Sequence, residues 1–120
     1  MSHGSHVDAP ADLAALIAWV DSDLDLLDEV SAEFVAQAPE WIDGLRSAVG
    51  AGDAPNTFRV AHTIKGAVSN FGAPAIFAVA AELEAKGRAG NLDGADALLP
   101  RVVGGVEQLA AFLAARPWRA

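Results

Sequence analysis

The 120-residue sequence contains no cysteine, and it has 8 lysine and arginine residues against 16 aspartate and glutamate residues. Without cysteine, the chain has no disulfides, no thiolate metal ligands and no thiol nucleophile, a composition typical of a reducing compartment. We therefore expect a cytoplasmic protein. Its formal charge of −8 would repel a nucleic-acid backbone and an anionic membrane. A protein partner is favoured, and we expect no nucleic acid to bind.

Long hydrophobic runs and period-two alternation are also missing from the sequence. Charged residues, glycine or proline interrupt each strongly apolar stretch well before the roughly 20 residues that a membrane span needs. We therefore expect no association with a membrane. No segment alternates like a half-buried strand over a useful length, so a β-sheet is not expected. The hydrophobic content of 52% is enough for one core in a chain of this size.

The chain divides into three parts. Residues 1–7 show no apolar periodicity and are interpreted as a disordered N-terminus or a cloning remnant, so their two histidines are set aside. Residues 8–116 form one predicted domain. Residues 117–120, which begin with Pro117, are interpreted as a C-terminal tail, and no role is assigned to Trp118.

Hydrophobic spacing predicts five helices within that domain. A short helix covers about 12–20, and a long one runs from about 22 to 49 with a bend near Pro39. The next helices cover about 53–71 and 74–90, and the last starts around 91–93 and ends before Pro117. Connections of a few residues favour antiparallel neighbours. The predicted fold is therefore all-α, an antiparallel up-down four-helix bundle with a short additional N-terminal helix.

The helix over 53–71 separates into two faces at 100° per residue. Ile64, Val68 and Phe71 form an apolar stripe that should pack inward. The opposite face should therefore meet the solvent. Four residues at positions i, i+3, i+4 and i+7 share that face: His62, Lys65, Gly66 and Ser69.

An exposed histidine beside a lysine has a definite chemical use. A neutral imidazole nitrogen is a nucleophile toward phosphorus, and phosphoryl transfer mainly needs alignment and stabilisation of charge. Lys65, one turn from His62, supplies a positive charge for the phosphoryl oxygens. Glycine inside a helix costs about 1 kcal/mol relative to alanine, so Gly66 needs a reason. Clearance for an approaching protein, with an aspartate in a pocket, is a concrete one.

These residues resemble a known family. The run His62-Thr63-Ile64-Lys65-Gly66, followed by Gly72, resembles the histidine phosphotransfer (HPt) domain, whose pattern is H-x-x-K-G with a further glycine six residues on. The resemblance covers nearly the whole domain. It includes three more segments: Phe34 through Pro39-Glu40, Gly52-Asp53-Ala54 and Glu82-Leu83-Glu84.

The resemblance implies roles for individual residues. His62 would be phosphorylated, Lys65 would stabilise the phosphoryl group and Gly66 would leave a gap for the partner. Glu84 would lie near the imidazole, facing the nitrogen that is not phosphorylated, with Arg88 one turn further. Partner-binding residues would be Gly66, Ser69, Arg59, Glu84 and Arg88, and Arg59, Lys86 and Arg88 would form a basic rim.

The resemblance also implies partners. Receiver domains of response regulators or of hybrid histidine kinases would exchange the phosphoryl group with a monomeric chain. This chain would bind no cofactor and no metal, whereas the partner receiver would need Mg²⁺. It would be a phosphocarrier without kinase activity of its own, because no phosphate-binding glycine loop is present.

Other functions stay open. The chain could be the phosphotransfer domain of a chemotaxis-type histidine kinase, loaded from ATP by a separate kinase domain. It could also be a structural docking bundle whose histidine is an idle surface residue. A metalloprotein bundle is disfavoured, because it would need inward Glu-x-x-His pairs on facing helices and the sequence has none.

Overall fold

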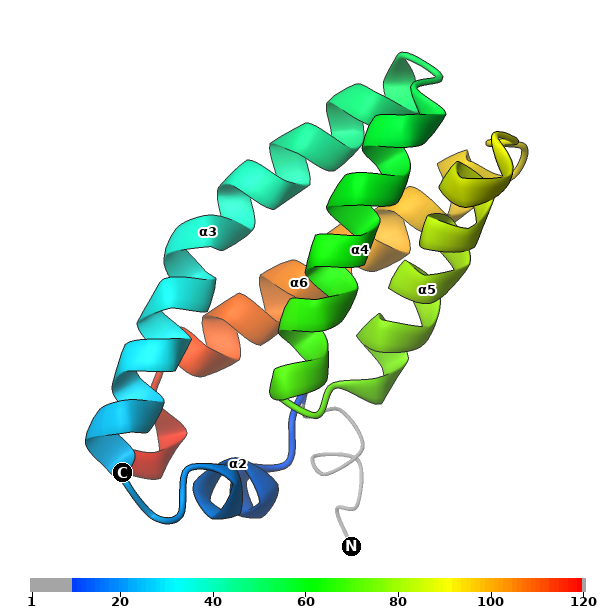
Figure 1. The fold of residues 1–120 in the computed structure, drawn as a ribbon. Helices are drawn as coiled ribbons and strands as arrows, with labels where there is room; N and C mark the ends of the chain where they lie inside the picture. The colour runs from blue at the N-terminus through cyan, green and yellow to red at the C-terminus, as the bar shows by residue number, and fades with distance from the viewer. Residues whose placement is uncertain (1–9, 120) are drawn as a thin grey trace, which may run out of the picture.

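The computed structural model describes residues 10–119, and these residues form helices and no strand. Figure 1 shows the long helices running along the molecule and a short helix across one end. The all-α, up-down four-helix bundle with a short additional N-terminal helix is thereby confirmed. The interpretation of residues 1–7 lies outside the described residues. The elements are α2 (Leu13–Trp19), α3 (Leu24–Gly50), α4 (Ala54–Asn70), α5 (Pro74–Ala89), α6 (Ala95–Ala114) and the 3-10 helix η1 (Pro117–Arg119).

Aspartate side chains start three of these helices. Asp12, Asp23 and Asp53 accept hydrogen bonds from backbone N–H groups in the first turns of α2, α3 and α4, which satisfies donors that have no partner inside a helix. Helix α6 starts later than the 91–93 predicted for it. The N-cap residue Gly94 has φ 83°, a left-handed conformation that glycine adopts at little cost.

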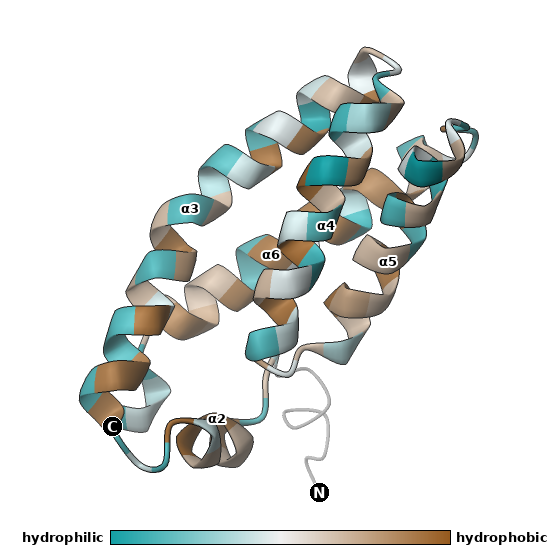
Figure 2. Ribbon diagram, in the orientation of Figure 1, coloured by the Kyte–Doolittle hydropathy of each residue, from teal (hydrophilic) through white to brown (hydrophobic). Residues whose placement is uncertain are grey.

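Each long helix buries one stripe of apolar side chains. Figure 2 shows hydrophobic and hydrophilic patches alternating along α3 and α4, the pattern of helices with one buried side. Pro39 lies inside α3 without dividing it into two helices, as predicted. The core residues without solvent exposure include Leu27, Leu45, Ile64, Val68, Leu83, Val106 and Leu109.

One stretch of the described residues is notably apolar. Ala95–Arg119 is long and apolar enough, by length and composition alone, to cross a membrane. Pro100 and charged residues interrupt this stretch, as predicted for every apolar segment, but its mean hydropathy is still high. Helix α6, which makes up most of the stretch, packs against α3 and α5, and Val102, Val106 and Leu109 are fully buried. Its apolar residues are those of a core helix.

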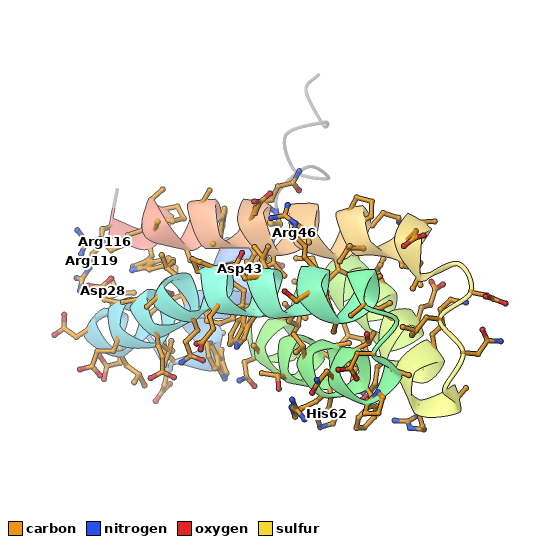
Figure 3. The ribbon with its side chains drawn as sticks, turned by 90° about the horizontal axis from the view of Figure 1, so that it is seen from above. Asp28, Asp43, Arg46, His62, Arg116 and Arg119 are labelled. Atoms are coloured by element: carbon orange, nitrogen blue, oxygen red, sulfur yellow. The ribbon has the colours of Figure 1, made fainter. Side chains whose placement is uncertain are left out.

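The C-terminal end of the described chain is held against the start of α3. The side chain of Trp118 is buried, and its Nε1 donates a hydrogen bond to Asp28 Oδ1 at 2.7 Å. Arg119 donates to Asp28 Oδ2 at 2.7 Å and to Asp25 Oδ1 at 2.7 Å. Figure 3 shows Asp28, Arg116 and Arg119 together at one end of the bundle. The hydrogen bond from Arg119 is the main reason that the pKa of Asp28 is lowered.

Candidate functional site

His62 lies in the middle of α4, and its side chain is 62% exposed. Ile64 and Val68 on the same helix are fully buried, so the two faces separate as the periodicity predicts. Figure 3 shows His62 at the edge of the bundle near α4 and α5, on the other side of the molecule from Asp43 and Arg46. The imidazole is therefore open to an approaching protein.

One nitrogen of the imidazole is hydrogen-bonded to a carboxylate. His62 Nδ1 lies 2.5 Å from Glu84 Oε2, which belongs to α5. The Glu84 side chain is only 3% exposed. Because an ionised carboxylate can only accept a hydrogen bond, Nδ1 carries the proton and donates it. In the neutral ring the lone pair is then on Nε2, which has no carboxylate partner in the part of the chain that the structure describes.

Two cations share the same carboxylate. Lys65 Nζ donates to Glu84 Oε1 at 2.7 Å, and Arg88 lies 3.6 Å from Oε2. Burial raises the pKa of Glu84, but the hydrogen bonds from Lys65 and His62 and the nearby positive charges outweigh burial. The net result is a pKa below the ordinary value of 4.5. Glu84 is therefore ionised at neutral pH, although it is buried.

Aromatic rings complete the surroundings of the imidazole. Phe58, one turn before His62 on α4, stacks on it with ring centroids 5.7 Å apart and an angle of 18° between the planes. The guanidinium of Arg88 lies 5.3 Å from the centroid of the Phe58 ring. Lys65 Nζ lies 5.8 Å from the Phe77 centroid. No motif in the sequence marks either phenylalanine as part of the site.

Two glycines inside helices have opposite surroundings. A Cβ at Gly66 would meet no atom of another element within 4 Å, so nothing among residues 10–119 requires glycine there. A Cβ at Gly87 would lie 2.5 Å from the backbone nitrogen of Phe58 and 2.9 Å from the carbonyl oxygen of Ala54. Gly87 therefore lets α5 approach α4 closely, with Glu84 and Arg88 on the adjoining turns. Gly87 was not among the predicted site residues. The only feature of the sequence that could have indicated it is a glycine inside a helix.

The other predicted residues lie near the site without joining it. The Arg59 guanidinium donates to the side chain of Asn56, and neither Arg59 nor Ser69 hydrogen-bonds to His62. Both residues are exposed on α4. The structure thus brings Glu84, Lys65 and Arg88 together around His62 and leaves Arg59 and Ser69 along the same helix. Among residues 10–119 no group of three or more potential metal ligands occurs.

Comparison with a solved structure supports this fold. The chain is similar to the crystal structure of histidine-containing phosphotransfer protein B (HptB) from Pseudomonas aeruginosa PAO1, with a TM-score of 0.82 and 26% sequence identity. The match covers 94% of this chain and 98% of that protein. A search of curated protein sequences found no match.

The family comparison identifies the domain. Residues 29–112 match the model of the Hpt domain. The matched segment contains most of α3, all of α4 and α5 and nearly all of α6, so it includes His62, Glu84 and Phe58. The chain therefore belongs to the Hpt domain family and is a histidine phosphotransfer domain of phosphorelay signalling.

Proposed function

We propose that His62 accepts a phosphoryl group from the aspartyl phosphate of one receiver domain and passes it to the aspartate of another. Residues 8–116 would carry this activity. The observation that carries the proposal is the 62% exposed imidazole whose Nδ1 is held by Glu84 while Nε2 is not. An imidazole in this arrangement presents one nucleophilic nitrogen, in one direction, to a protein that docks on α4.

The forward step involves one bond made and one broken. Nε2 of the neutral imidazole attacks phosphorus in line with the departing aspartyl oxygen, the new N–P bond forms and the receiver carboxylate leaves. The ring becomes positively charged, and its proton stays on Nδ1, where ionised Glu84 stabilises it. In the reverse step the ring leaves as neutral imidazole, because that proton is retained.

Two cations that lie against Glu84, beside the imidazole, would offset the charge that arrives with the phosphoryl group. The Lys65 side chain is 25% exposed and is already fixed by Glu84 Oε1, so little ordering is needed before transfer. The Arg88 side chain is 63% exposed and lies on the adjoining turn of α5. We assign Lys65 to phosphoryl stabilisation and Arg88 to contact with the partner.

The partner would dock over the exposed face of α4. The empty space around Gly66 leaves room for the rim of a receiver pocket, and Arg59 and Ser69 extend the same face. The receiver supplies the aspartate and its own Mg²⁺, so the chain itself needs no cofactor. We propose that it acts as a cytoplasmic monomer with no kinase activity of its own.

A transfer assay tests this function. Receiver domains are phosphorylated with acetyl phosphate and Mg²⁺, freed of donor and mixed with the wild-type chain or with His62→Gln. The proposal predicts that the phosphoryl group moves to the wild type and not to the variant. Circular dichroism should show the same helicity for both proteins. Equal labelling of both proteins would contradict the assignment of His62, and normal signalling through His62→Gln would show that the histidine is idle.

A parallel reaction tests the remaining alternative, in which a kinase domain loads the chain from ATP. The chain is mixed with the catalytic domain of a histidine kinase and ATP instead of a phosphorylated receiver. The receiver-to-receiver proposal predicts much slower labelling than from the receivers. Faster labelling from ATP would identify the chain as a kinase phosphotransfer domain.

A further inference from the structure

The hydrogen bond to Glu84 does not by itself fix the imidazole. It holds only one ring atom, Nδ1, so rotation about the side-chain torsions can break this contact and turn the other nitrogen toward Glu84. The side chain is 62% exposed, so solvent does not hold the ring in place. A second contact is needed to define the ring plane.

Phe58 provides that second contact. Its ring is nearly parallel to the imidazole, with 18° between the planes and 5.7 Å between the centroids. The two residues are four apart on α4, which places their side chains one above the other. Stacking covers one face of the imidazole, and the hydrogen bond holds one edge. Together they leave the ring little freedom.

The Phe58 ring is itself held from α5. Arg88 places its guanidinium 5.3 Å from the ring centroid and is anchored 3.6 Å from Glu84 Oε2. Gly87 lies against the backbone of Phe58, because a Cβ there would come within 2.8 Å of its Cα. The residues that contact His62 and Phe58 from α5 thus lie on consecutive turns of one helix. A shift of α5 would move both supports together.

We propose that Phe58 is a positioning residue that fixes the plane of the His62 imidazole and thereby selects Nε2 as the phosphoryl acceptor. The consequence for transfer rests on the proposed function. The lone pair of Nε2 lies in the ring plane, so attack on phosphorus requires that plane to contain the line of approach. Phe58 touches no reacting atom and acts through the imidazole.

The test first examines the ring without any phosphoryl transfer. Nitrogen NMR of the ¹⁵N-labelled chain reports which nitrogen of neutral His62 carries the proton. Wild type should show the Nδ1–H form, since Glu84 accepts that proton. Phe58→Leu and Phe58→Met keep an apolar side chain without a flat ring and should give a mixture of both forms. Phe58→Tyr keeps the ring and should match wild type.

A matched control removes an aromatic ring elsewhere. Trp19 is 45% exposed on α2 and packs edge-on against Phe71. Trp19→Leu should leave the His62 proton on Nδ1. Circular dichroism selects folded variants, and using both Leu and Met provides a folded example if one of them loses stability. A wild-type proton distribution in a folded Phe58→Leu or Phe58→Met variant would overturn the proposal.

The rate of transfer gives a second readout. Transfer from a phosphorylated receiver should be about tenfold to a hundredfold slower in Phe58→Leu and close to wild type in Phe58→Tyr, because misplacing a reacting group is costly. Unchanged rates in Phe58→Leu would also overturn the positioning role. If wild type receives no label, the proposed function fails separately, because the NMR result needs no phosphorylation.

Discussion

At the scale of single residues, the site depends on one buried carboxylate with several partners. Glu84 accepts from His62 on one oxygen and from Lys65 on the other, with Arg88 close to the first. A buried carboxylate would ordinarily be costly, but three partners keep it ionised. It can therefore orient the imidazole and hold Lys65 in place before any partner arrives.

Removing the charge of Lys65 should slow transfer without unfolding the bundle. We expect Lys65→Ala to reduce the rate of His62 phosphorylation by about tenfold to a hundredfold, because a positioned charge near the phosphoryl oxygens is lost. Stopped-flow transfer from a phosphorylated receiver measures the rate. Arg46→Ala is the control, since Arg46 is exposed on the other side of the molecule. Equal rates for both variants would refute charge stabilisation by Lys65.

The hydrogen bonds and ion pairs of Glu84 should also make the free energy of unfolding depend on pH. Its folded pKa is lowered from 4.5, so its contribution is present above that pH and is lost as pH falls through the lowered value. We expect Glu84→Gln to lower the free energy of unfolding by about 1 to 2 kcal/mol at neutral pH. Urea titrations of both proteins across the acid range measure this difference.

The sign of the pH effect makes that prediction specific. Wild type and Glu84→Gln should converge in acid, because wild-type Glu84 then becomes protonated and loses its charge-assisted bonds. Glu82→Gln serves as the control, since Glu82 is exposed on the same helix. A gap between wild type and Glu84→Gln that stays constant down to acid pH would show that the carboxylate is not stabilised by its charge.

At the scale of elements, the site is a property of the α4 and α5 pair. Helix α4 supplies His62, Lys65 and Phe58, whereas α5 supplies Glu84 and Arg88. Contact between the two helices is close where Gly87 meets Phe58. The distance between these helices therefore decides whether the carboxylate reaches the imidazole.

Two alanine substitutions should have opposite effects on stability. Gly66→Ala fills open space on α4 and should raise the free energy of unfolding by up to about 1 kcal/mol, through better helix propensity. Gly87→Ala puts a methyl group 2.5 Å from the Phe58 backbone nitrogen and should cost about 1 to 3 kcal/mol. Chemical denaturation of both variants measures the two effects, and a stabilising Gly87→Ala would contradict the close approach.

A larger side chain at Gly66 tests whether this position affects receiver binding, separately from stability. Gly66→Gln should weaken binding to a receiver while helicity is kept, because the side chain would occupy the space left for the partner. Gly104→Gln is the control on α6, where a Cβ also meets no atom within 4 Å. Titration calorimetry measures binding, and equal affinities for both variants would reject the clearance role of Gly66.

The elements were predictable from the sequence where local patterns decide them. Periodicity placed His62 opposite Ile64 and Val68, because a helix repeats its faces whatever lies around it. The close contact at Gly87 and the stacking of Phe58 were not foreseen. They depend on the distance and rotation between α4 and α5, which no local pattern contains. The start of α6 was misplaced for a smaller reason, because Gly94 could not be recognised as its N-cap.

At the scale of the whole molecule, the C-terminal segment closes the end of the bundle far from the site. Asp28 receives hydrogen bonds from Trp118 and Arg119 and pairs with Arg116 at 3.4 Å. Tertiary contacts of this kind are invisible to sequence patterns, since the partners are about 90 residues apart along the chain. They join the first turns of α3 to the end of the described chain.

Neutralising Asp28 should loosen that end without affecting the site. Asp28→Asn loses the charge that pairs with Arg116 and Arg119, so hydrogen exchange of residues 116–119 should accelerate while the Lys65 and Glu84 region is unchanged. The hydrogen bond from Arg119 is the largest cause of the lowered pKa of Asp28, whose ordinary value is 3.8. In the wild type, exchange at residues 116–119 should therefore accelerate only as pH falls below 3.8. Unchanged exchange at 116–119 would show that the charge of Asp28 contributes nothing.

The most direct test of the central claim maps the phosphoryl group itself. After transfer from a phosphorylated receiver, phosphorus and nitrogen NMR of the ¹⁵N-labelled chain identify the phosphorylated atom. The account predicts one base-stable, acid-labile phosphate on Nε2 of His62, with the proton still on Nδ1. Phosphate on Nδ1, or on any residue other than His62, would contradict it.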